Sequence, residues 1–137
     1  GLIKTEKEDM KLVSDLLDWM QKSKADFTNT FNDLTLQKKL EDKIYNDEEF
    51  QHWHNQWKKR KKNNPDSQLL MRKNNPIVIP RNHNVENALR AAENGDIDIF
   101  NRLLDVLSSP YENNNLIKSY QTPPKPEERV YQTFCGT

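Results

Sequence analysis

The sequence has one cysteine and three glycines in 137 residues. A single thiol cannot form an internal disulfide, and one cysteine cannot anchor a cysteine-based zinc site. The glycines, Gly1, Gly95 and Gly136, lie too far apart to form the phosphate-binding loop of a Rossmann or P-loop protein. These two scarcities exclude disulfide scaffolds, zinc fingers and glycine-loop nucleotide sites.

Long apolar runs and a net charge are missing as well. The sequence has no run of about 18 apolar residues, so it predicts no membrane-spanning helix. No basic segment followed by an apolar stretch marks a secretory signal. The 21 basic residues balance 21 acidic ones, which argues against a disordered polyelectrolyte. The chain opens on Gly1 rather than on a methionine, so we expect its native start to lie elsewhere.

Apolar residues make up 34% of the chain and the mean hydropathy is −1.05. Ordinary globular domains contain roughly 45–50% apolar residues, counting glycine. The composition therefore predicts a helical body with a thin core, or a piece of a larger protein whose apolar face packs against a partner.

The apolar residues that are present recur at helical spacing. Thr5 and Glu8 have the spacing of a capping box before a first helix, whose expected apolar stripe is Met10, Val13, Leu16, Leu17 and Met20. Further helices are predicted over residues 27–34, from Thr35 to about residue 44, after Asn46 or Asp47, at 66–71, from Asn82 or Asn84 to Asn94, and from Asp96 to about residue 109.

Prolines interrupt this pattern in two places. Pro76 and Pro80 forbid a regular helix over residues 74–82, which we expect to be extended. Pro123, Pro124 and Pro126 predict an extended, polyproline-like stretch near the C-terminus. The expected fold class is all-α, with a helical subdomain over residues 1–110 and an irregular, proline-rich tail over residues 111–137.

The polar residues suggest few sites of their own. His52 and His54 flank Trp53 and point to nearly opposite sides of a helix, so they cannot share a metal ion. The basic run at residues 58–62 fits a nucleic-acid patch, or a solvated helix end whose cations face free carbonyls; the zero net charge favours the helix end. Cys135 has no basic neighbour that would activate it as a thiolate.

Four short motifs closely resemble the carboxy-terminal part of the selenoprotein O family, in their order, their spacing and their coincidence with the chain end. They are residues 25–31 (ADFTNTF), 75–83 (NPIVIPRNH), 91–96 (AAENGD) and 126–137 (PEERVYQTFCGT). The resemblance covers nearly the whole chain. It implies a piece of a kinase-like protein adenylyltransferase that uses ATP with Mg²⁺ or Mn²⁺ to move AMP onto hydroxyl groups of proteins.

The family's nucleotide, metal and catalytic residues lie in an upstream core, and none has a matching position here. The resemblance therefore implies a non-catalytic segment with no catalytic, cofactor or metal residue, whose partner is the kinase-like core of the same chain. Animal members carry selenocysteine near a Cys-x-x-Sec ending, whereas this chain ends in Cys135, Gly136 and Thr137. The ending looks like that of bacterial members and implies a cytoplasmic protein; a eukaryotic member would be mitochondrial.

The expected role is to brace the core and to hold the tail, with the Cys135 thiol as a redox contact. The residues expected to dock against the core are Trp53, Trp57, Arg81, Phe100 and Phe134. Protein substrates are expected for the parent enzyme, and neither a membrane nor a nucleic acid is an expected partner. Two alternatives stay open: a stand-alone helical interaction module, and a nucleic-acid binder that uses residues 58–62.

Overall fold

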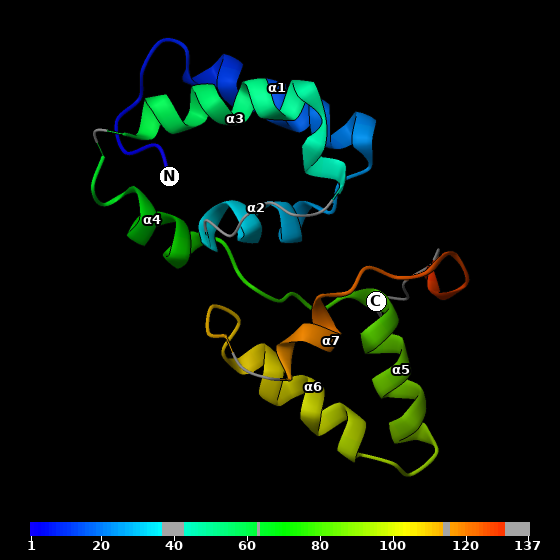
Figure 1. Cartoon of the computed structure of the whole chain (residues 1–137). Helices are drawn as coiled ribbons and strands as arrows, with labels where there is room; N and C mark the ends of the chain where they lie inside the picture. The colour runs from blue at the N-terminus through cyan, green and yellow to red at the C-terminus, as the bar shows by residue number, and fades with distance from the viewer. Residues whose placement is uncertain (37–42, 63, 114–115, 131–137) are drawn as a thin grey trace. The chain divides into compact units, whose positions relative to one another are not determined.

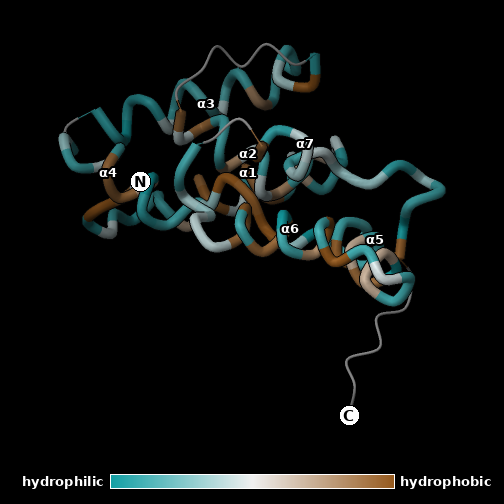
Figure 2. The backbone as a smooth tube through the Cα atoms, turned by 90° about the horizontal axis from the view of Figure 1, so that it is seen from below, coloured by the Kyte–Doolittle hydropathy of each residue, from teal (hydrophilic) through white to brown (hydrophobic). Residues whose placement is uncertain are grey.

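The computed structural model describes residues 1–36, 43–62, 64–113 and 116–130, and every regular element within them is a helix. This confirms the expected all-α class (Figure 1). The α-helices are α1 (Asp9–Ser23), α2 (Phe27–Leu36), α3 (Glu48–Lys61), α4 (Ser67–Asn74), α5 (Asn82–Glu93), α6 (Asp98–Ser108) and α7 (Ile117–Gln121). Two short 3₁₀ helices, η1 (Lys43–Asn46) and η2 (Pro126–Glu128), complete the set. Figure 2 shows polar and apolar residues interspersed along these helices, as amphipathic helices require.

The internal contacts divide the chain into two units, Gly1–Asn75 and Pro76–Thr137. The sequence predicts a different boundary, with a tail that begins at residue 111. The contacts group residues 76–110 with part of that tail because Ile77, Val78, Val106 and Ile117 form one buried apolar cluster. The same cluster explains α7, a helix inside the segment that was expected to be irregular.

In the first unit, α1 and α3 run antiparallel. Three hydrogen bonds join them in reversed order along the chain: Asp9 with Arg60, Leu12 with Trp53, and Trp19 with Asp47. The helix α3 begins as predicted, because the Asp47 carboxylate accepts a hydrogen bond from the Phe50 backbone N–H at 3.0 Å. Its first turn is acidic and its last turn basic, which matches the helix dipole.

The start and the buried face of α1 differ from the prediction. The helix begins at Asp9, and Glu8 at its N-cap makes no side-chain cap, so the Thr5–Glu8 capping box is wrong. The buried residues are Asp9, Leu12, Leu16, Trp19 and Met20, whereas Met10, Val13 and Leu17 of the expected stripe are exposed. The reason is that α3 packs against the side of α1 that carries Leu12, Leu16 and Trp19.

The third predicted helix is also corrected. Thr35 lies inside α2 and donates to the Phe31 carbonyl oxygen, so it caps no new helix. Ile44 belongs to η1, and Leu40 lies outside the described residues. Tyr45 of η1 is buried and packs on Trp19 and Phe50 at centroid distances of 6.0 and 4.9 Å.

The second unit is built on α5 and α6, which pack against each other. Asn94 and Gly95 turn the chain between them, and Gly95 has a positive φ of 88° that favours glycine. The extended segment between α4 and α5 is anchored by its backbone: Ile77 N–H donates to the Pro110 carbonyl at 2.7 Å. The Ile77 carbonyl accepts a hydrogen bond from the Gln121 side-chain amide at 3.0 Å, and this bond ties α7 to the same segment.

Candidate functional site

The two tryptophans predicted to dock lie in the core of the first unit. Trp53 and Trp57 are 4% and 6% exposed, and their rings stack at a centroid distance of 5.8 Å. The Trp53 indole N–H donates to the Leu12 carbonyl of α1 at 2.7 Å. Phe50, between Trp19 and Trp53, is fully buried. These rings join α3 to α1, so little of their surface is left for a partner.

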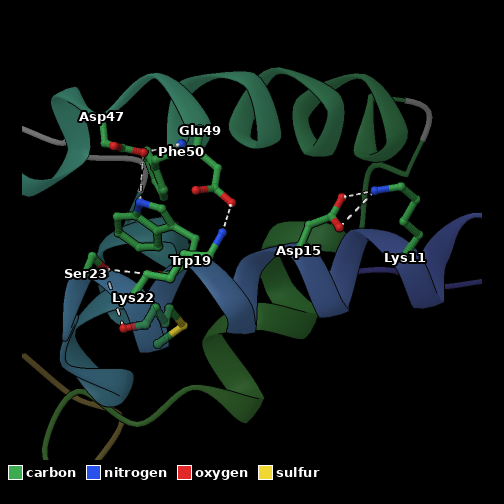
Figure 3. Close-up of polar contacts among 9 residues, drawn as sticks. Lys11, Asp15, Trp19, Lys22, Ser23, Asp47, Glu49 and Phe50 are labelled. Atoms are coloured by element: carbon green, nitrogen blue, oxygen red, sulfur yellow. Dashed lines mark hydrogen bonds and ion pairs between the residues drawn. The ribbon is translucent and has the colours of Figure 1, made fainter.

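Polar contacts fix both ends of the α1–α3 pair. At one end Asp47 accepts from the Trp19 indole N–H at 3.1 Å, and Lys22 pairs with Glu49 at 2.9 Å (Figure 3). At the other end the Arg60 guanidinium contacts Asp9 at 2.7 and 2.9 Å. It also pairs with Glu6 at 3.1 Å and donates to the Lys4 carbonyl.

The Arg60 contact lowers the pKa of its partner, Asp9. The hydrogen bonds from Arg60 and from the Glu6 backbone N–H hold the pKa of Asp9 below its ordinary value. The same pairing raises the pKa of Arg60. Both charges are therefore used to hold α1 to α3, and the long separation of these residues along the chain hid this from sequence reasoning.

The basic run is only partly available as a surface. Arg60 is paired as above, and the Lys61 ammonium lies 3.8 Å from the centroid of the Trp57 ring. Lys58, Lys59 and Lys62 are exposed. The nucleic-acid alternative would therefore depend mainly on these three lysines.

The histidines of α3 have local contacts. His54 stacks on Phe50 and Trp57, each at 5.5 Å, and burial together with Lys58 and Lys61 lowers its pKa to about 4. His52 lies 2.7 Å from the Gln56 side chain. Within the described part of the chain, no three His, Cys, Asp or Glu side chains gather closely enough to hold a metal ion.

An apolar groove of about 290 Å³ opens between α1, α2 and α4. Sequence reasoning missed the groove, although Val13, Leu16 and Leu17 of the predicted stripe line it. The groove is lined by Gly1, Leu2, Leu12, Val13, Leu16, Leu17, Phe31, Leu34, Trp53, Trp57, Met71 and Asn75.

In the second unit, two of the motifs that carry the family resemblance meet. Arg81, at the N-cap of α5, is 9% exposed and shares a hollow of about 430 Å³ with Arg129 and Val130. A polar groove of about 520 Å³ adjoins it and is lined by His83, Asn84, Glu86, Asn87, Arg90, Glu127, Glu128, Arg129 and Val130. Residues 80–83 and 127–130 thus lie together, which their separation in the sequence could not show.

The remaining candidates are placed only in part. Phe100 is half-buried on α6. Phe134 and Cys135 lie outside the described residues, so docking by Phe134 and redox chemistry at Cys135 stay predictions. No helix in the described part is both long and apolar enough to cross a membrane.

The fold gives the class, an all-helical chain over its described residues, and comparison with known proteins gives the family. Residues 1–108 match the family model described as "Protein adenylyltransferase SelO". The chain therefore belongs to the SelO family, which confirms the resemblance.

Curated relatives extend this match to the whole chain. The chain is similar over its full length to "Protein nucleotidyltransferase YdiU" of Nitrosococcus oceani (50% identity), Alcanivorax borkumensis (46%) and Clostridium botulinum (44%). In each case it spans 29% of the relative's length.

Proposed function

We propose that this chain is a non-catalytic helical segment of a longer SelO-family protein nucleotidyltransferase, and that it braces the kinase-like core of that protein. The observation that carries the proposal is coverage: the whole chain matches relatives of which it spans only 29%. A segment of this size with a family match over residues 1–108 would then be one part of a larger catalytic unit.

The described side chains support a structural role. The Asp9–Arg60, Lys22–Glu49 and Trp19–Asp47 pairs all connect α1 to α3 or to the turn before it. Helices as short as these gain their stability from packing rather than from intrinsic propensity. A segment whose helices are held together by such pairs is suited to presenting fixed apolar surfaces to a neighbouring core.

For the parent protein we propose transfer of AMP from ATP to Ser, Thr or Tyr hydroxyls of protein substrates, with Mg²⁺ or Mn²⁺. Such chemistry depends on positioning the phosphates and on neutralising their charge with metal ions and basic groups. We place those groups in the core outside this chain. A cytoplasmic location and a redox contact from Cys135 to that core belong to the same proposal.

The test compares the full gene product with the 137-residue chain. Calorimetry with ATP and Mg²⁺ or Mn²⁺, and transfer of labelled AMP to protein, are measured on both. We expect binding and transfer only with the full gene product, and no binding by the short chain in the micromolar range, about −8 kcal/mol. Stoichiometric ATP binding by the short chain, with its helical circular dichroism intact, would refute the non-catalytic role.

A further inference from the structure

The apolar groove of the first unit has an exposed apolar mouth. Val13 and Leu17 of α1 line it and are 45% and 42% exposed. Its deeper walls are buried, with Leu12 and Leu16 from α1, Trp53 and Trp57 from α3 and Met71 from α4. An apolar hollow with half-exposed apolar side chains at its mouth is suited to receiving another apolar group.

The first residues of the chain lie in this groove. Gly1 and Leu2 are part of its lining, and Ser67 of α4 donates a hydrogen bond to the Gly1 carbonyl at 2.6 Å. A Cβ atom at Gly1 would lie 2.5 Å from Ser67 Oγ and 2.8 Å from Met71 Cγ. The backbone at Gly1 is therefore packed closely against α4, and Figure 1 marks the N-terminus near this helix. Because Gly1 lines the groove, any residue before it would start inside or beside the groove.

We propose that the groove is filled by the stretch of polypeptide that directly precedes Gly1 in the full-length protein, with an apolar side chain seated at Val13 and Leu17. The inference rests on the proposed function, in which this chain is one part of a longer protein. It adds that the first unit is completed from upstream, so that α1 is covered on two sides, by α3 and by the preceding segment.

Photo-crosslinking in the full-length gene product tests this directly. A diazirine analogue of leucine replaces Leu17, and a diazirine analogue of methionine replaces Met10 as the matched control. Met10 is on the same helix, is 76% exposed and does not line the groove. An extended chain advances about 3.3 Å per residue, so we expect crosslinks from position 17 to fall within about ten residues before Gly1.

Mass spectrometry of the irradiated protein separates the outcomes. A peptide from directly before Gly1, linked to position 17 but not to position 10, supports the proposal. Dimer-mass products at position 17 would assign the groove to a second copy. Links to a distant part of the same chain, or reaction of the probe with water alone, would also overturn the proposal, as the dimer product would.

A stability measurement tests, without a crosslinking probe, whether Val13 and Leu17 are covered in the full-length protein. Val13→Asp and Leu17→Asp in the full-length protein should lower its melting temperature by several degrees, whereas Met10→Asp should leave it nearly unchanged. Equal melting temperatures for all three variants would overturn the proposal. Neither readout depends on AMP transfer, so an inactive parent with the expected crosslink would refute the proposed function and leave this inference standing.

Discussion

Asp47 connects two parts of the first unit, and its removal should show how strongly they are coupled. Its carboxylate accepts from the Phe50 backbone N–H at 3.0 Å and from the Trp19 indole N–H at 3.1 Å (Figure 3). The first bond caps α3, and the second satisfies a donor on a ring that is 2% exposed. Asp47→Ala removes both acceptors at once.

The expected cost follows from these two bonds. Loss of an N-cap costs about 1 kcal/mol. An indole N–H left unpaired in the core costs about 1–3 kcal/mol. Asp47→Ala should therefore lower the free energy of unfolding by about 2–4 kcal/mol. For a unit of this size, the melting temperature should fall on the order of 10 °C or more.

The matched variants separate the two contributions. Asp47→Asn keeps an oxygen acceptor and should stay within about 1 kcal/mol of the unsubstituted chain. Trp19→Phe removes the indole donor, so Asp47→Ala in that background should cost only the cap, about 1 kcal/mol.

Urea unfolding followed by circular dichroism at 222 nm gives the free energies of unfolding of the unsubstituted chain and of the four variants without depending on the number of tryptophans. If Asp47→Ala costs the same in both backgrounds, the Trp19–Asp47 bond contributes nothing. If Asp47→Asn is as destabilising as Asp47→Ala, the account of the cap is wrong as well.

Three further predictions concern the same unit. Trp53→Ala should destabilise it by about 3–5 kcal/mol in urea unfolding, and wild-type-like unfolding would mean that this ring is not core. The lowered pKa of Asp9 predicts a contribution to stability that is present above the ordinary pKa of Asp and is lost as pH falls through the folded-state pKa. Asp9→Asn should therefore make the melting temperature depend less on pH below about pH 4. The same pH dependence in both proteins would contradict this. His54, with its pKa lowered from 6.5 to about 4, stays neutral in the folded state, so stability should decline as pH falls from 6.5 to 4; His54→Gln should remove that decline, and an unchanged slope would argue against it.

The helix α3 shows what sequence alone could predict. Its capping residue, its acid-to-base polarity and its stripe of Phe50, Trp53 and Trp57 are all signals within one short segment. They agree with one another, so the helix and its start followed from local reasoning. In contrast, α7 is five residues long and depends on Ile117 packing with Ile77 and Val106, contacts that no local pattern reveals.

The candidate site divides in the same way. The motifs at residues 75–83 and 126–137 stand out in the sequence because they resemble a family. Their meeting around Arg81 and Arg129 is a tertiary fact, which the sequence could not give. The role of Trp53 and Trp57 was equally ambiguous. A tryptophan on an apolar helix stripe can dock against a partner or pack in the core of its own unit, and only the packing of α1 decides between the two.

The helix α1 explains why its buried face was mispredicted. At 3.6 residues per turn, its apolar residues from Trp19 round to Met10 cover an arc of roughly 180°. A helix that packs on one neighbour needs an apolar arc of about 100°. Local periodicity therefore could not decide which half faces α3, and the half that does not still carries Val13 and Leu17 at 45% and 42% exposure. A chain with only 34% apolar residues that leaves such side chains at the mouth of an apolar groove is consistent with the proposal that a preceding segment of a longer protein covers this half of α1.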